Sequence, residues 1–244
     1  DITVSNLTAQ NVSLVADTGA LINAADSTMN VTAINLRIET DDAIGASDRH
    51  ITTTAATLTA LSTGTDAAGI YITETDTITV DTVTVTVTEF NETAGTAGVT
   101  DAAQSDLVTA ANNGNIVLVA GNTITLNDGT DADGQAVNAN GSGNILIDAN
   151  AGNIDINSDI LSGTGHITLK AATDILVGDG TATGVDIATA TAGTISLDAE
   201  AGAVTMAGDS TITAADSSLR VNAATDITVS NLTAQNVSLV ADTG

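Results

Sequence analysis

Residues 143–156 read GNILIDANAGNIDI, and the fold can be inferred from this segment. It contains two short apolar alternations, 145–147 (ILI) and 154–156 (IDI), separated by the polar run DANAGN. Successive side chains of a strand point to opposite faces, so the outer isoleucines face one side and the middle residue faces the other. Gly and Asn tolerate the positive φ of tight corners. The stretch therefore predicts two strands, each with one buried face, joined by a corner.

The same pattern recurs along the chain. Further examples occupy residues 2–4, 12–14, 36–38, 116–118, 124–126, 167–169, 175–177, 195–197, 204–206 and 219–221. The strongest strands begin at Asn144, His166, Thr194 and Ser218, at intervals of 22, 28 and 24 residues that each contain a weaker strand. Evenly spaced hairpins with Asn-Gly turns would indicate an up-and-down sheet, but such turns are sparse. We predict an all-β, right-handed parallel β-helix (β-solenoid), with the hand taken from the general preference of crossover connections.

Composition agrees with such a stack. Apolar residues make up 43% of the chain but aromatic residues only 1%, so the core must consist of Val, Ile, Leu and Ala. The formal net charge of −26 excludes nucleic acid and anionic membranes as partners, because both are bound through basic residues. This charge is compatible with divalent cations. An apolar run of about 18 residues is absent, so no membrane insertion is expected.

The two ends of the sequence are identical. Residues 1–19 and 226–244 both read DITVSNLTAQNVSLVADTG, which gives an offset of 225 residues. We interpret residues 1–225 as one solenoid unit and residues 226–244 as the start of the next. The expected partners are further copies of the same repeat in the same chain. With about ten coils per unit and about 4.8 Å per coil, one unit would be about 50 Å long.

The runs at 143–149, 151–156 and 165–171 resemble repeats of filamentous-haemagglutinin-type proteins. The resemblance covers residues 115–240 and, more loosely, 1–45. It implies a right-handed parallel β-helical shaft of a large secreted bacterial adhesin, located outside the cell or on its surface. Three features depart from the family: the coil lengths are uneven, the repeat is much longer than one coil, and no secretion domain is visible.

Residues 70–114 break the coil pattern. Residues 77–88 read TITVDTVTVTVT, an alternation too long for one side of a coil, and a loop-like stretch follows it. One interpretation is a protruding arm that pairs with a neighbouring filament or partner. The other is a widened coil whose corners are filled by the two aromatic residues. The self-association candidates are Tyr71, Thr82, Thr84, Thr86 and Phe90.

The densest acidic loop, residues 128–134, reads DGTDADG. Carboxylates at this spacing in a Gly-containing turn can surround a hard cation such as Ca²⁺, which makes Asp128, Asp131 and Asp133 candidate ligands. The loop matches neither an EF-hand nor the glycine-rich nonapeptide of calcium-binding rolls. A solvated polar corner is the alternative interpretation.

Catalytic motifs are missing from the sequence, and we expect no enzyme. A polysaccharide lyase-like β-helix would need a base beside clustered carboxylates, and the four basic candidates are Arg37, Arg49, Lys170 and Arg220. In an array, Arg37 of the next unit follows Arg220 by 42 residues, about two coils, so the two arginines can share a face. An ice-binding solenoid would need a flat Thr array, but the outward strand positions are mixed.

The sequence therefore predicts a structural repeat of an extracellular filament or adhesin shaft. Such a repeat would serve as a rod or spacer in surface attachment, in a sheath or in a matrix. The expected partners outside the chain are neighbouring filaments or cell-surface carbohydrate, and Ca²⁺ is the candidate ion.

Overall fold

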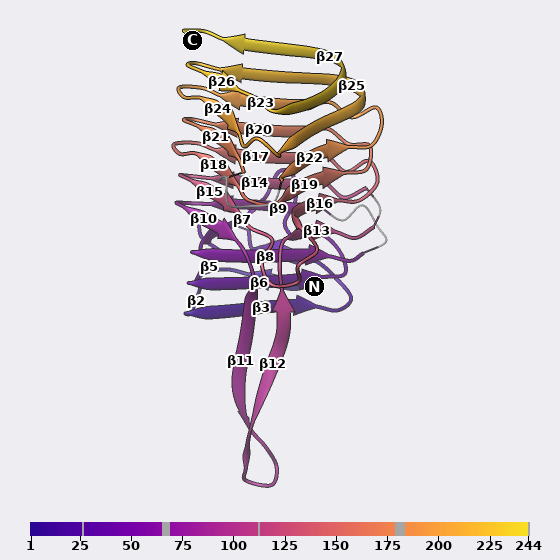
Figure 1. Cartoon of the computed structure of the whole chain (residues 1–244). Coiled ribbons are helices and arrows are strands. Elements are labelled where there is room, and N and C mark those ends of the chain that lie inside the picture. The colour runs from indigo at the N-terminus through magenta and orange to yellow at the C-terminus, as the bar shows by residue number, and fades with distance from the viewer. Residues whose placement is uncertain (26, 65–68, 112, 179–183, 244) are drawn as a thin grey trace.

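The computed structural model describes residues 1–25, 27–64, 69–111, 113–178 and 184–243. Asn112 of the predicted insertion and Gly244, the last residue of the second identical segment, lie outside them. All regular elements within the described ranges are β-strands, and one large sheet of parallel pairs runs through the stack (Figure 1). The predicted β-solenoid is confirmed. The described part of the chain also contains no helix long and apolar enough to cross a membrane.

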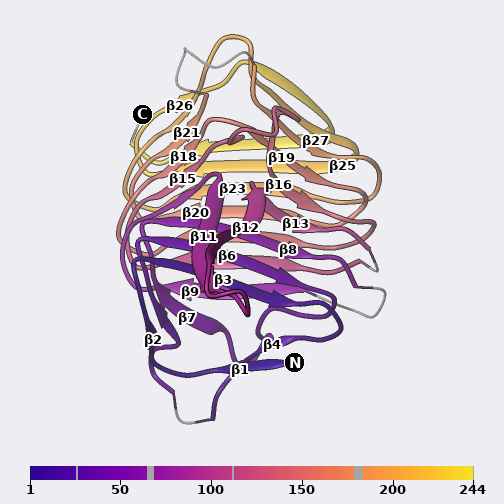
Figure 2. The ribbon, with the colours of Figure 1, turned by 90° about the horizontal axis from the view of Figure 1, so that it is seen from below.

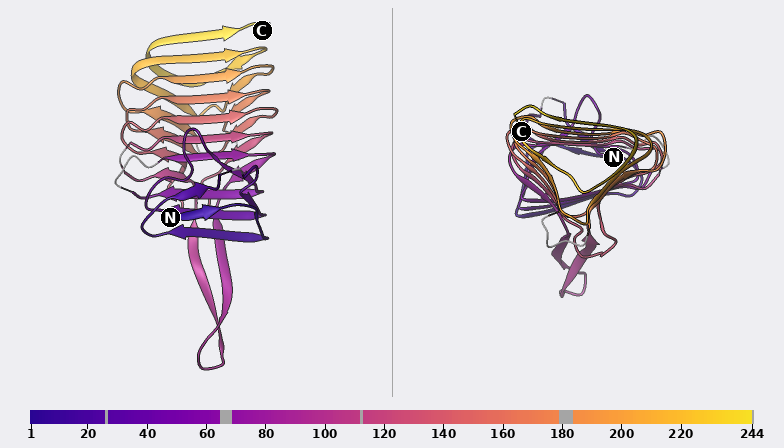
Figure 3. Two further views of the ribbon diagram at one scale, coloured as in Figure 1. Left: turned by 180° about the vertical axis from the view of Figure 1, so that it is seen from behind. Right: turned by 45° about the horizontal axis from the view of Figure 1, so that its top comes forward.

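The upper coils have a three-sided outline (Figure 3). One long strand per coil forms what we call the back side: β9 (Ile70–Glu74), β14 (Ile116–Ala120), β17 (Ile145–Ala149), β20 (Ile167–Ala171) and β23 (Ile195–Ala199). Two separate strands per coil form the arm side: β10 (Ile78–Val80) and β13 (Leu107–Thr109), β15 (Ile124–Leu126) and β16 (Gln135–Ala139), β18 (Ile154–Ile156) and β19 (Asp159–Ser162), β21 (Ile175–Val177) and β22 (Asp186–Thr189). The last coils are built from β24 (Val204–Met206), β25 (Thr211–Ala223), β26 (Ile227–Thr228) and β27 (Asn231–Ala241).

In the lower coils the arrangement is reversed: the continuous strand is on the arm side and the divided strands are on the back side. The arm side there has one continuous strand per coil: β3 (Asn11–Ala16), β6 (Asn35–Thr40) and β8 (Thr57–Ser62). The back side instead has short strands: β1 (Ile2–Val4), β2 (Leu7–Thr8), β4 (Leu21–Asn23), β5 (Val31–Thr32) and β7 (Ile51–Thr54). The switch takes place directly above β8, which pairs with β10 through Leu58 and with β13 through Ala60.

The register can be followed up the arm side. It runs through Leu14, Ile38, Ala60, Leu107, Val137, Ile160, Ile187, Ile212 and Leu232. These are eight steps of one coil each. Leu239, which corresponds to Leu14 in the second identical segment, pairs with Val221 on the back side, half a coil after Leu232. The repeat of 225 residues therefore spans about 8.5 coils, somewhat fewer than the ten expected, because an inserted arm uses part of the chain.

Aliphatic side chains fill the interior. On the back side the inward ladder of Leu118, Ile147, Leu169 and Leu197 is fully buried, and it belongs to one continuous core cluster. Burial of one such side chain stabilises the fold by about 1.5–3 kcal/mol. The strands predicted at Asn144, His166, Thr194 and Ser218 stack on one another in this ladder, as their spacing suggested.

Polar columns complete the corners. Asn144 Oδ1 accepts a hydrogen bond from the His166 backbone N–H at 2.8 Å, and His166 Nδ1 in turn accepts one from the Thr194 backbone N–H at 3.0 Å. Backbone N–H groups at the strand starts thereby find acceptors in the neighbouring coil. Gly165 lies in the same corner, where an added Cβ would stand 2.0 Å from the carbonyl oxygen of Gly143. Close stacking of the coils therefore requires glycine at this position.

An antiparallel hairpin projects from the stack. Its strands are β11 (Val83–Phe90) and β12 (Thr96–Gln104), and we call residues 83–104 the arm. The arm leaves the arm side between β10 and β13, contacts β8, β6 and β3, and runs along the solenoid axis past the first coil (Figures 1 and 2). A projecting hairpin is thus observed at the centre of 70–114, while β9, β10 and β13 remain regular members of the stack. Its pairing with a filament or partner stays a prediction.

Candidate functional site

Two departures from the coil meet at the root of the arm. The arm itself interrupts one coil between β10 and β13, and the acidic loop of residues 128–134 interrupts the next coil at the same corner, between β15 and β16. The Thr130 backbone N–H donates to Thr82 Oγ1 at 2.7 Å, and Thr82 Oγ1 is 2.8 Å from Ser105 Oγ. The loop is therefore hydrogen-bonded to Thr82, the residue before the arm, and Thr82 in turn is hydrogen-bonded to Ser105, the residue after it.

Three carboxylates converge at this corner. One oxygen each of Asp106, Asp131 and Asp133 lies within 4.8 Å of the others. Asp106 is only 1% exposed, whereas Asp131 and Asp133 are exposed, so the group has a buried floor and an open rim. We call these three residues the acidic cluster.

The backbone of Asp106 fixes this residue to the neighbouring strand β8. Its carbonyl oxygen accepts hydrogen bonds from the Ala60 N–H at 2.9 Å and from Thr59 Oγ1 at 3.0 Å, and its φ of 67° is in the left-handed region that Asp tolerates better than most residues. Its Oδ1 atom is buried and has no hydrogen-bond partner. A buried carboxyl oxygen without a partner is costly, and a cation bound by the three aspartates would supply one.

The electrostatics agree with this geometry. Burial is the main cause that raises the pKa of Asp106 to about 9, and the charges of the neighbouring aspartates are the second cause. Without a cation the Asp106 carboxyl is therefore neutral at pH 7. A bound cation would reverse the sign of the local potential and favour the ionised form. Oxygen-only ligands of this kind suit Ca²⁺ better than a transition metal.

Only part of the predicted ligand set is brought together. Asp131 and Asp133 belong to the acidic cluster, but Asp128 turns aside: its Oδ1 accepts from the Gly134 N–H at 2.9 Å, and it lines a separate hollow with Asp81, Asn127 and Asp159. The sequence did not predict Asp106 as a ligand, because the whole arm separates this residue from β10 along the chain. The only signal was that a chain leaving a coil must return to the same corner.

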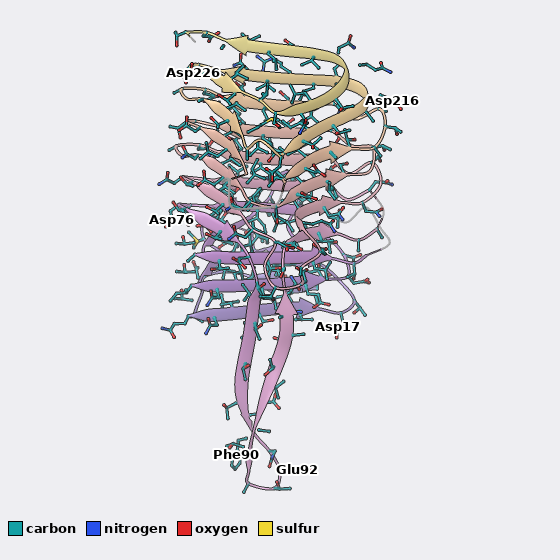
Figure 4. The ribbon with its side chains drawn as sticks, in the orientation of Figure 1. Asp17, Asp76, Phe90, Glu92, Asp216 and Asp226 are labelled. Carbon is teal, nitrogen blue, oxygen red and sulfur yellow. The ribbon has the colours of Figure 1, made fainter. Side chains whose placement is uncertain are left out.

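The self-association candidates are spread over two faces. Thr82 lies at the arm root, Thr84 and Thr86 are exposed on β11, and Phe90 is 75% exposed near the far end (Figure 4). Tyr71 does not share this surface. It lies in β9 on the back side, with its ring centroid 5.9 Å from that of His50.

The basic residues lie in other surroundings. Arg37 pairs with Glu39 at 2.5 Å, Lys170 pairs with Glu200 at 2.9 Å, and Arg220 lies 4.0 Å from Asp198. None of these three described pairs involves the acidic cluster. The outward positions of the back side carry side chains of several kinds: Tyr71, Val117, Leu146, Thr168, Ser196 and Arg220. This mixture supports neither a lyase-like groove nor a flat Thr plane.

One further acid is buried away from this corner. Glu74 is 1% exposed and accepts hydrogen bonds from Thr53 Oγ1 at 2.7 Å and from the Ala55 N–H at 2.9 Å. Burial raises its pKa to about 7. Its partners satisfy the carboxylate, so we assign it to the packing of the lower coils.

Comparison with known proteins gives no relative: no family model, curated protein or solved structure matches the chain.

Proposed function

We propose that this chain is a structural repeat of a long extracellular filament or adhesin shaft, in which tandem units stack end to end as one rod. The observation that carries the proposal is the contrast between the two identical segments. Val12 is 5% exposed under the neighbouring coil, whereas its counterpart Val237, in the last strand, is 47% exposed. Both valines stack on one neighbouring coil, Val12 on Leu36 and Val237 on Leu219, and Val237 is left open on the side where the next unit would stack.

Stacking gives such a rod its mechanism. Each coil contacts only its neighbours through backbone ladders and an aliphatic core, so added units extend the core without a change of design. The inward residues Val237 and Leu239 are 47% and 46% exposed, and another coil would cover them. The net charge of −26 keeps such rods soluble and apart, and Ca²⁺ at the acidic cluster would reduce the repulsion between carboxylates.

Location and partners follow from the same proposal. A rod of this kind suits the outside of a bacterial cell, with cell-surface carbohydrate or neighbouring filaments as contacts. The family resemblance supports this location and the right hand of the coil. The repeated segment supports a spacer in preference to an enzyme, because identical copies add length but no new chemistry.

Chains of one, two and three units test the proposal. At about 8.5 coils of about 4.8 Å each, every added unit should lengthen the particle by about 41 Å in small-angle scattering, and the melting temperature should rise from one unit to two. Units that behave as separate compact particles on flexible linkers, with the stability of a single unit, would overturn the proposal.

A further inference from the structure

Equivalent residues of the two identical segments lie on opposite sides of the solenoid. Leu14 stacks on Ile38 on the arm side, and Leu239 stacks on Val221 on the back side. In a tandem array each copy of the segment makes both contacts, one toward the unit before it and one toward the unit after it. The back side of one unit then continues directly into the arm side of the next. Successive units are consequently related by about half a turn, added to any twist of the coils.

The arm points toward the unit that would precede it. It runs past β3, the first strand of the arm side, and beyond the N-terminal end of the stack (Figures 1 and 3). Eight residues of β11 extend over about 27 Å, whereas the two steps from β8 to β3 take only about 10 Å. More than half of the arm therefore hangs beyond the coils that the chain itself provides.

One face of the arm changes from buried to exposed along its length. Val83 and Val85 face the solenoid and are 2% and 6% exposed. By strand alternation Val87 lies on the same face, where it pairs with Val99, and these two are 59% and 46% exposed. The valines of β11 are thus buried against the solenoid at the base of the arm and become exposed to solvent where the chain's own coils end.

The base of the arm is well anchored to the solenoid. Arg37 is 6% exposed, and its Nε donates to the carbonyl oxygen of Ala102 at 3.1 Å. Gln104 Nε2 donates to the carbonyl oxygen of Ile38 at 2.9 Å. The arm thus crosses the outward column that contains Ser13, Arg37 and Thr59.

That column has a continuation on the back side. Ser238, the counterpart of Ser13, pairs with Arg220, and Arg220 pairs with Ser196. In an array the column therefore runs from Arg37 of one unit through Ser13 to Arg220 and Ser196 of the unit before it. These positions border a hollow lined by Ile195, Ser196, Leu219, Arg220, Val237 and Ser238.

We propose that the exposed half of the arm straps the back side of the preceding unit in the same chain, with Val87 and Val99 over this hollow. Arg220 of the preceding unit lies two coils, about 10 Å, below Arg37, and three residues of an extended strand cover the same distance. Val99 is three residues before Ala102, so Val99 meets the level of Arg220. Glu89 and Asp101 flank the valines on the same face and give Arg220 a carboxylate partner.

A cross-link within a two-unit chain tests the strap, which rests on the proposed rod. The chain has no natural cysteine, so an introduced pair is unambiguous. We expect Val99→Cys in the second unit to form a disulfide with Arg220→Cys or Ser196→Cys in the first unit under mild oxidation. Val99→Cys combined with Leu161→Cys, which is outward on the arm side of the first unit, should stay reduced.

A second measurement does not depend on disulfide geometry. Val87→Asp should leave a single unit unchanged, because Val87 is already exposed there, and should lower the melting temperature of the two-unit chain by about 2–4 °C. Equal effects in both chains, cross-linking to Leu161→Cys, or disulfides between separate chains would overturn the strap. If the two-unit particle also fails to lengthen by about 41 Å, the rod itself is wrong; normal lengthening with no cross-link rejects the strap alone.

Discussion

Arg37 on β6 and Ala102 on the returning strand of the arm are joined by a hydrogen bond of 3.1 Å from the guanidinium Nε to the carbonyl oxygen. The Arg37 side chain is 7% exposed and also pairs with Glu39. Arg37 therefore ties the arm to the lower coils, together with Gln104, which belongs to the arm itself.

Loss of this anchor should loosen the arm. We expect Arg37→Gln to lower the free energy of unfolding of a single unit by about 1–3 kcal/mol, since a buried charged donor and its hydrogen bonds are removed. Arg220→Gln is the matched control, because Arg220 is 48% exposed and 4.0 Å from its partner, and it should cost under about 1 kcal/mol. Denaturant titration measures both, and equal losses would show that Arg37 is no anchor.

Stability should fall as the pH rises when no metal is present. The pKa of Asp106 is raised to about 9 and that of Glu74 to about 7, so the folded chain binds protons that the unfolded chain releases above its ordinary carboxyl pKa. The stabilisation is complete below about pH 4 and is lost progressively up to about pH 9. Thermal unfolding in a chelator across this range measures it. Asp106→Asn should flatten the upper part of the curve, and an unchanged slope would contradict the assignment.

Calcium should bind at the acidic cluster and should oppose that trend. We expect Ca²⁺ to raise the melting temperature, more strongly at pH 8 than at pH 6, because protons compete for Asp106. Asp106→Asn and Asp131→Asn should each abolish the shift. Asp128→Asn should keep it, since that side chain lies outside the cluster. Equal shifts in all three variants would indicate diffuse binding along the acidic surface.

Coil spacing should be sensitive to one methyl group at a corner. Gly165→Ala places a Cβ 2.0 Å from the backbone oxygen of Gly143, and backbone cannot move aside cheaply, so we expect a loss of about 1–3 kcal/mol or more. Gly208→Ala has nothing within 4 Å of the new Cβ and should be nearly neutral. Comparable losses at both sites would mean that the coils are less tightly stacked than described.

Much of the fold could be predicted from the sequence because period-2 alternation with Gly and Asn corners specifies strands that are buried on one face. The ladder from Ile145 to Leu219 follows directly from that spacing. The switch above β8, from one continuous arm-side strand to two separate strands, could not be predicted, because a strand of the same composition fits either side. Only the register shows that Leu58 and Ala60 stack on two separate strands.

The arm and the site were predictable only in part. The Thr-Val alternation indicated a long strand, but residues 91–95 contain no two-residue turn signal that would identify a hairpin. Local spacing suggested Asp131 and Asp133, and it also suggested Asp128, whose bond to Gly134 depends on the loop conformation. Asp106 reaches the cluster only because the chain returns to this corner after the arm. A short sequence motif cannot predict such a long-range contact.

In the proposed rod, identical units continue one another as a single solenoid of about 8.5 coils each. Cryo-electron microscopy of a three-unit chain tests this continuity most directly, because the arm of residues 83–104 marks each unit. We predict an unbroken rod with arms about 41 Å apart along the axis, on alternating sides, each lying against the unit before it. Arms that all leave from one side, or units separated by breaks in the rod, would contradict it.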